Sequence, residues 1–304
     1  MTYECELAFS AIDAAIRVTC SDRLVLERIA AQLSTASGVV AALSMTVKRG
    51  AGSGRAVGAV HVESARAGSA FAVSFSGSAS TRRYIADIDE IVADTYTVVL
   101  AVLQTALMPR SVIAIHAAFL DVHGAGVLVA GPSGAGKTST SVAALEAGFA
   151  VFASEITFIG DGWVLLGESS LTIEAGAMAE FGLGVPENAE RRGTSWIVPL
   201  PVLFEPRMID VVVFPRVGLF PCVRRRVPRR SAEVQAFECV TSQASVWRMV
   251  GNRTEHVSVP WDASSSVHTI NQAFRICDRP TWLIGGTPQT VVSSIAEIVG
   301  CNHS

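Results

Sequence analysis

Lysine is almost absent from this chain of 304 residues: Lys48 and Lys137 are the only two, and the other basic residues are arginines. Charged residues make up only 17% of the chain and hydrophobic residues 50%, which excludes a disordered protein and supplies a packed core. The net charge of −3 gives no overall attraction to nucleic acid or to an anionic membrane. The length suggests about two domains.

The sequence also lacks several features that would indicate other classes of protein. The six cysteines form no CxxC pair and no Cys/His cluster with zinc spacing, so we expect buried free thiols in a reducing compartment. The N-terminus has no basic segment of a secretory signal. The most apolar long stretch, residues 91–108, contains Asp94 and Gln104, which favours a core helix over a membrane span. We therefore predict a cytoplasmic protein without membrane contact.

A complete phosphate-binding pattern, GxxxxGK[ST], surrounds the second lysine. It consists of Gly131, Pro132, Ser133, Gly134, Ala135, Gly136, Lys137 and Thr138. In such a P-loop, backbone N–H groups surround the α- and β-phosphates of a nucleotide, the lysine reaches the β- and γ-phosphates, and the Thr hydroxyl binds Mg²⁺. An apolar run at 126–130 predicts a buried strand before the loop. Residues 138–147 predict a helix after it, so the phosphates would lie at a helix N-terminus. The alternative is a glycine-rich turn that matches the pattern by chance.

The rest of the chain predicts an α/β protein with a small N-terminal α+β domain. We place this first domain at residues 1–85, with strands at 14–19, 57–62 and 70–75 and a basic loop at 48–55. A long helix over residues 85–108 leads into the second domain, residues 86–304. There we expect strands at 112–120, 149–153 and 211–214, a hairpin around 160–162, and a final helix at 290–299.

The order of a histidine-containing strand, a short turn, a strand, the P-loop, a helix and a strand ending near an acid resembles the C-terminal kinase domain of the HPr kinase/phosphorylase family. His116 precedes Gly131 by fifteen residues, the spacing of that family's catalytic-site histidine. Residues 209–216 and 280–298 resemble a subgroup that modifies peptides, including lasso-peptide precursors. The resemblance covers residues 95–304 and implies a P-loop core of the HPr-kinase type, ATP and Mg²⁺ as cofactors, and a homo-oligomer.

Three positions depart from the family pattern. Ser154 replaces the first of two paired acids and leaves Glu155 alone. Ser139 stands where HPr kinases carry a glutamate, directly after the loop. Residues 180–185 partly match a family signature but lack its arginine.

Phosphoryl transfer to a hydroxyl requires a phosphate cradle, a Mg²⁺ ion and a group that accepts the proton. The loop, Lys137 and Ser139 would bind the nucleotide, and Thr138 and Glu155 the metal. Glu155 is also a candidate proton acceptor, or else an ordinary surface residue at a strand end. His116 could orient or deprotonate the acceptor hydroxyl, or it could be a core histidine. We expect His116, Lys137 and Glu155 to be the catalytic residues.

Two arginine sites could contact phosphates or a partner. Arg216 follows the strand at 211–214 and could bind the nucleotide phosphates, because a guanidinium matches phosphate geometry, or it could be solvated. The densest basic run comprises Arg224, Arg225, Arg226, Arg229 and Arg230. It is either a solvated loop or a docking site for an acidic peptide or protein. No nucleic-acid recognition motif accompanies it.

The sequence therefore predicts an ATP-dependent kinase that phosphorylates a Ser or Thr hydroxyl on a peptide or small protein. One alternative is an ATP-binding scaffold or regulator of a peptide-modifying pathway that has lost efficient transfer, an interpretation favoured by Ser154. The other is a kinase of a free small metabolite.

Overall fold

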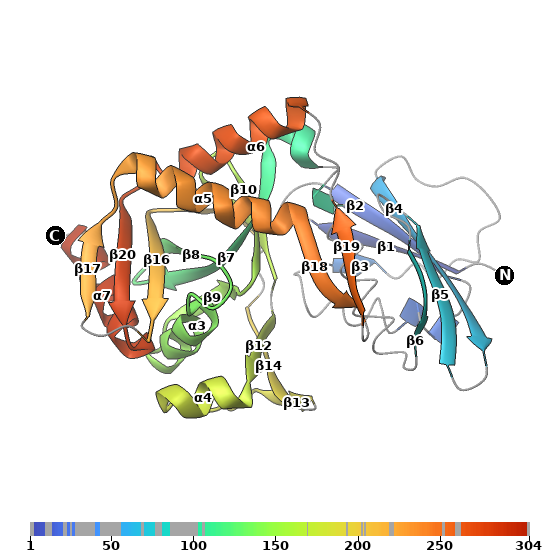
Figure 1. Cartoon of the computed structure of the whole chain (residues 1–304), viewed down its shortest axis with the longest axis horizontal. Coiled ribbons are helices and arrows are strands. Elements are labelled where there is room, and N and C mark those ends of the chain that lie inside the picture. Colours follow the sequence, from blue (N-terminus) through green and yellow to red (C-terminus); the bar gives the residue numbers. More distant parts are fainter. Residues whose placement is uncertain are drawn as a thin grey trace. The chain divides into compact units, whose positions relative to one another are not determined.

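The computed structural model describes residues 3–9, 14–20, 23–24, 26–27, 40–42, 56–67, 70–76, 81–85, 103–104, 107–168, 170–192, 194–201, 203, 205–218, 222–250, 253–258 and 263–302 (Figure 1). The chain divides into two compact units. The first unit comprises residues 1–35, 39–110 and 244–266, and the second comprises residues 36–38, 111–243 and 267–304.

The first unit contains a six-stranded sheet in the order β3-β1-β2-β4-β5-β6. Its strands are β1 (Tyr3–Phe9), β2 (Ala14–Cys20), β3 (Val40–Ala42), β4 (Ala56–Ala67), β5 (Ala70–Ser76) and β6 (Thr81–Ile85). The same unit contains the hairpin of β18 (Ser245–Val250) and β19 (Arg253–Ser258). The three strands predicted at 14–19, 57–62 and 70–75 are confirmed as β2, β4 and β5.

The sequence placed a domain boundary after residue 85, whereas the two units meet in the chain at residues 110 and 111. The first unit also contains residues 244–266, which start at the last residue of helix α5 (Arg229–Ala244). Sequence reasoning had no means of assigning this distant segment to the first unit. The basic loop predicted at 48–55 lies wholly outside the described residues. Most of the helix predicted at 85–108 also lies outside them, and a 3₁₀ turn, η2 (Met108–Arg110), is described at its C-terminal end.

The second unit is built on a mixed sheet, which within the described residues contains nine strands. Eight run in the order β15-β11-β10-β7-β8-β16-β20-β17, and β9 pairs with β7. They are β7 (Val112–Val122), β8 (Ala125–Ala130), β9 (Ala150–Ala153), β10 (Ile156–Gly160), β11 (Trp163–Gly167), β15 (Arg207–Met208), β16 (Val211–Val217), β17 (Val223–Arg226) and β20 (Thr281–Gly286). Strands β8, β16 and β20 are parallel, and their pairing with the other strands is antiparallel.

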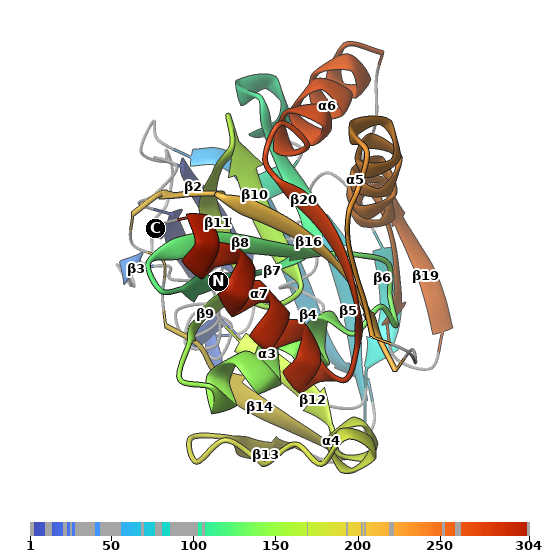
Figure 2. The same ribbon diagram turned by 90° about the vertical axis from the view of Figure 1, so that its left-hand side faces the viewer.

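Helices cover both faces of this sheet, which explains why its central strand β8 has no polar side chain (Figure 2). Every residue of β8 is buried, and alternate residues such as Val127 and Val129 pack with α3 (Lys137–Glu146) and α7 (Pro288–Asn302). Helices α5 (Arg229–Ala244) and α6 (Ala263–Ile276) lie on the opposite face, where Cys239 and Ile276 are buried. Burial on both faces fixes the carboxyl ends of β8 and β16, where the candidate site is found.

A small sheet extends the second unit beside α3. It has the order β12-β14-β13, from β12 (Ser170–Glu174), β13 (Glu190–Arg192) and β14 (Ser195–Pro199), and α4 (Ala175–Phe181) follows β12 directly. Leu171, Ile173 and Val198 join the same hydrophobic core as α3 and α7. This packing places the end of α4 near the loop that precedes α3.

The structure is thus a mixed α/β protein with a large mixed sheet, as the sequence predicted. Within the described part of the chain, no helix is long and apolar enough to cross a membrane. None of the four cysteines with described side chains is in a disulfide; Cys20, Cys239 and Cys277 are buried as predicted, whereas Cys222 is exposed.

Candidate functional site

The glycine loop, residues 131–136, connects the buried strand β8 to the N-terminus of α3. Gly134 and Gly136 adopt φ angles of 79° and 97°, a region that favours glycine. A Cβ atom on Gly136 would lie 2.2 Å from Cγ2 of Val217, so no other residue fits there without a shift. No side chain caps α3 at Gly136. The first N–H groups of the helix are therefore available to an anion, and the helix dipole favours negative charge at this point.

Lys137 begins α3 and bends back over the loop. Its side chain is buried, and Nζ donates hydrogen bonds to the carbonyl oxygens of Gly131 at 2.9 Å and Pro132 at 3.0 Å. Burial lowers the pKa of Lys137, and the negative charge of Glu155 acts in the opposite direction. A buried cation held only by neutral carbonyl oxygens would be stabilised further by a bound phosphate.

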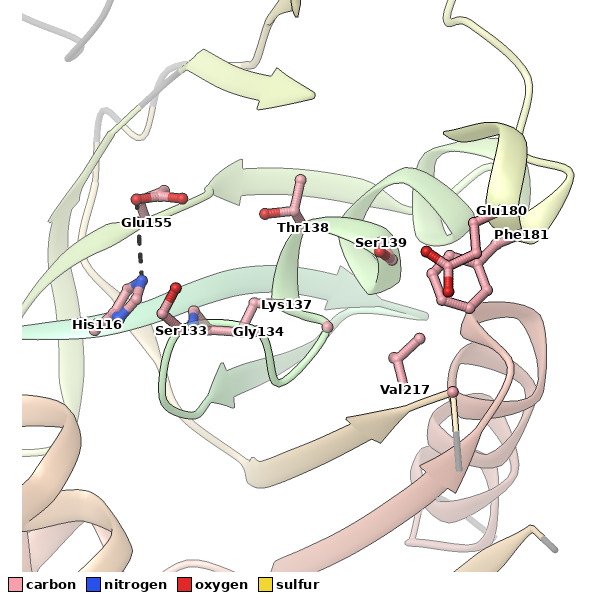
Figure 3. Close-up of a pocket in the computed structure, with 12 residues that line it drawn as sticks. His116, Ser133, Gly134, Lys137, Thr138, Ser139, Glu155, Glu180, Phe181 and Val217 are labelled. Atoms are coloured by element: carbon pink, nitrogen blue, oxygen red, sulfur yellow. Dashed lines mark ion pairs between the residues drawn. The ribbon is translucent and has the colours of Figure 1, made fainter. Parts of the chain in front are cut away.

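His116 and Glu155 come together through strand pairing. In the β7–β10 ladder His116 lies opposite Ile156, and the N–H of Ala117 donates to the carbonyl oxygen of Glu155 at 3.2 Å. The His116 Nε2 atom is 3.9 Å from Oε2 of Glu155, an ion-pair distance rather than a hydrogen bond (Figure 3). The His116 side chain is 13% exposed and that of Glu155 46% exposed. The imidazole is held by its surroundings, while the carboxylate can reach a ligand.

These groups line one cavity of about 390 Å³, within the usual size range of small-molecule sites. His116 and Glu155 lie at one end, and the loop and the start of α3 form the middle (Figure 3). The predicted residues that line the cavity are His116, Ser133, Gly134, Gly136, Lys137, Thr138, Ser139 and Glu155. The structure therefore brings the loop together with His116 and Glu155, which are 39 residues apart in the sequence.

Four predicted residues do not line the cavity. Gly131 and Pro132 contribute carbonyl oxygens to Lys137, and the carbonyl of Ala135 accepts a hydrogen bond from the N–H of Val217 at 3.1 Å. These three build the loop rather than its open surface. Arg216 is exposed at the end of β16, and the cavity is lined instead by its neighbour Val217. Successive side chains of a strand point to opposite faces, which the sequence pattern could not assign here.

Ser154 also lies outside the cavity lining. It is 1% exposed, and its hydroxyl donates a hydrogen bond to the carbonyl oxygen of Ser170, at the start of β12. Its role in this structure is to tie the end of β9 to the small sheet. Because this hydroxyl is buried and does not line the cavity, it does not face a metal ion or a water bound beside Glu155.

Sequence reasoning missed the far end of the cavity, which is lined by Glu180, Phe181, Val217 and Gly218. Glu180 and Phe181 end α4, and Val217 and Gly218 follow the buried part of β16. The available signal was weak: residues 180–185 were noted only for a partial signature, and nothing in the sequence placed them opposite β16.

A metal ion at this site would have few protein ligands. Within the described residues, no group of three His, Cys, Asp or Glu side chains is arranged to hold a metal. Thr138 and Glu155 are two of the side chains with hard oxygen donors that line the cavity. This pair fits Mg²⁺, which is commonly held by one or two protein oxygens, substrate phosphates and water. Asp210, at the other end of β16, accepts a hydrogen bond from the N–H of Gly126 at 2.8 Å and is structural.

The basic run forms β17 and the start of α5, at an edge of the sheet. Arg224 pairs with Glu297, and Arg229 pairs with Glu233 and Asp278. The guanidinium groups of Arg224 and Arg226 lie 5.6 and 5.7 Å from the centre of the Trp282 ring. Among the described residues, no ion pair is formed by Arg225, Arg226 or Arg230, so part of the positive charge is available to a partner.

Comparison with known proteins does not assign this chain. A scan against models of protein families finds no match, and a search of the curated proteins also finds none.

Proposed function

We propose that this protein is an ATP-dependent kinase of the HPr-kinase type, which transfers the γ-phosphoryl group of ATP to a Ser or Thr hydroxyl of a peptide or small protein. One observation carries the proposal: a histidine and a carboxylate from two strands lie at one end of a cavity whose middle is a glycine loop and a buried lysine. These are the parts that phosphoryl transfer requires.

In this proposal the loop N–H groups and Lys137 bind the phosphates of ATP. Thr138 and Glu155 would hold Mg²⁺, which neutralises charge on the β- and γ-phosphates when bound. The acceptor oxygen forms a bond to the γ-phosphorus as the bond to the ADP oxygen breaks. The acceptor's proton passes to His116 or Glu155, which face each other across 3.9 Å. With a single carboxylate at this end, His116 is the better acceptor if Glu155 is bound to the metal.

The acceptor chain would dock on the basic run. Arg225, Arg226 and Arg230 offer positive charge without an ion-pair partner among the described residues, which suits an acidic peptide or protein. A run of several arginines is of less use to a free small metabolite than to an acidic chain, so the peptide acceptor is the leading choice.

The test is Mg²⁺-dependent transfer from γ-labelled ATP to synthetic peptides and to proteins of a cell extract, comparing wild type with Lys137→Ala. Removing one charge-stabilising donor should lower transfer on the order of 10²- to 10³-fold. Arg216→Ala is the matched control, because this exposed cation lies beside the cavity without lining it, and it should retain wild-type transfer. Circular dichroism of both variants establishes that they fold.

A scaffold without efficient transfer is the second candidate, because Glu155 is the only carboxylate beside the His116 end of the described cavity lining. That candidate predicts ATP binding with neither transfer nor hydrolysis. Such a result would contradict the kinase proposal.

A further inference from the structure

The far end of the cavity has a different chemical character from the end that holds His116 and Glu155. Its described lining is an aromatic ring from Phe181, the aliphatic side chain of Val217, the backbone of Gly218 and one exposed carboxylate from Glu180. An aromatic and aliphatic wall with a single polar group does not suit phosphate. It suits the flat base and the hydroxyl-bearing ribose of a nucleoside.

The direction of a bound nucleotide follows from the loop. Phosphates over the N-terminus of α3 have His116 and Glu155 on one side and Ser139, Glu180 and Phe181 on the other (Figure 3). The transferred phosphate must lie at the His116 end, because the proton acceptors are there. The nucleoside must then extend past Ser139 toward Phe181.

The wall that carries Phe181 is fixed from two sides. Gln289 of α7 donates a hydrogen bond to the carbonyl oxygen of Phe181 at 3.3 Å, and Glu146 at the end of α3 accepts one from the N–H of Gly184. The Phe181 side chain packs partly against the hydrophobic core while still lining the cavity. A ring held in this way can bind a flat partner without first becoming ordered, which favours affinity.

We infer that Glu180 and Phe181 form the nucleoside-binding end of this site: the Phe181 ring stacks on the base, and the Glu180 carboxylate accepts hydrogen bonds from the ribose hydroxyls. The inference rests on the proposed function, because the transferred phosphate at the His116 end fixes the direction of the bound nucleotide.

The first experiment compares binding of ATP and of inorganic tripolyphosphate, which has the phosphates but no nucleoside, by isothermal titration calorimetry. Phe181→Leu keeps an apolar side chain for the core and removes the ring. It should weaken ATP binding by about 5- to 150-fold and leave tripolyphosphate binding within about twofold, because stacking of one base on a ring accounts for that factor. Phe181→Trp should retain the affinity for ATP.

The matched control is Phe149→Leu, since Phe149 is also a partly buried ring on the same core but does not line the cavity. It should leave both ligands unchanged. Equal weakening of ATP and tripolyphosphate by Phe181→Leu would show a purely structural role for Phe181 and overturn the inference. Wild-type ATP affinity in Phe181→Leu would overturn it as well.

The second experiment tests the ribose contact with 2′,3′-dideoxy-ATP. Glu180→Gln should weaken ATP binding by about 3- to 10-fold, the value of a partly exposed charge-assisted hydrogen bond, and leave binding of dideoxy-ATP unchanged. Glu187→Gln is the control, because Glu187 is exposed and lies outside the cavity lining. Equal effects on the two nucleotides would exclude the ribose contact.

These outcomes separate the two proposals. A Phe181-dependent preference for ATP without any phosphoryl transfer would support the nucleoside site and exclude the kinase. Phosphoryl transfer by wild type, together with an unchanged ATP affinity in Phe181→Leu, would support the kinase and exclude the nucleoside site. Failure of wild type to bind either ligand would overturn both.

Discussion

The glycine loop and the His116–Glu155 end of the cavity are built in different ways. The loop is local: residues 131–136 are contiguous, glycines supply the positive φ angles, and Lys137 folds back on the carbonyls of its own loop. The His116–Glu155 end is long-range, since it exists only because β7 pairs with β10. A local feature such as the loop can be recognised from a few residues and disrupted by one backbone change. A long-range feature such as the His116–Glu155 end depends on the packing of the whole sheet.

If the glycine loop binds ATP and the His116–Glu155 end carries out phosphoryl transfer, then His116→Gln should impair transfer without impairing ATP binding. Loss of a positioned acid–base group should lower the rate of phosphoryl transfer about 10²- to 10⁴-fold, while the dissociation constant for ATP stays within about twofold. Single-turnover kinetics and calorimetry measure the two quantities. His123→Gln, an exposed histidine in a turn, is the control and should change neither. A parallel loss of ATP binding in His116→Gln would show that His116 contributes to binding as well as to transfer, and would contradict this division between the two ends.

The local character of the loop can be tested at Gly136. Gly136→Ala combines a positive φ angle with a Cβ 2.2 Å from Val217, whereas Gly148→Ala has a similar φ angle of 81° and nothing within 4 Å. The strained backbone alone costs about 1–2 kcal/mol of unfolding free energy. We expect Gly136→Ala to lower the unfolding free energy by about 3 kcal/mol and to abolish ATP binding. Gly148→Ala should lower the unfolding free energy only by the cost of the backbone strain. Urea unfolding measures both; equal losses would mean that the loop tolerates the added methyl group.

Ser154→Asp tests whether the residue next to Glu155 is a lost acid or a packing residue. If the proposed kinase has been weakened by the loss of an acid, an acid at this position should restore activity, but here a carboxylate would be buried against the carbonyl oxygen of Ser170. We therefore expect the unfolding free energy to fall by about 2–3 kcal/mol without a gain in transfer, and Ser154→Ala to lose only about 1 kcal/mol. A stable Ser154→Asp variant with faster transfer would instead support an enzyme weakened by loss of that acid.

The buried thiol of Cys239 predicts that the stability of the protein depends on pH. Burial raises the pKa of the Cys239 thiol to about 12 from its usual 9.0, although the charge of Lys137 lowers it. The folded protein then holds this proton more tightly than the unfolded chain. Stability from Cys239 is complete below pH 9 and is lost as the pH rises toward 12.

At pH 10 this loss should be about 1.4 kcal/mol relative to pH 8, and Cys239→Ala should remove it. Urea unfolding of wild type and Cys239→Ala at both pH values gives the difference. Cys222→Ala, at an exposed thiol, should unfold like wild type at each pH. An identical pH dependence in wild type and Cys239→Ala would show that the thiol ionises normally in the fold.

The sequence by itself determined the buried strand, the glycine loop, the helix and Lys137, because these are contiguous and each residue type has a local reason. The sequence selected His116 and Glu155 separately, and the pairing of β7 with β10 brings them within 3.9 Å. Only the tertiary structure decided that Val217 rather than Arg216 faces the cavity, that Ser154 is bonded to Ser170, and that Glu180 and Phe181 close the far end. Each of these depends on strand orientation or on contacts between distant segments, which no short pattern encodes.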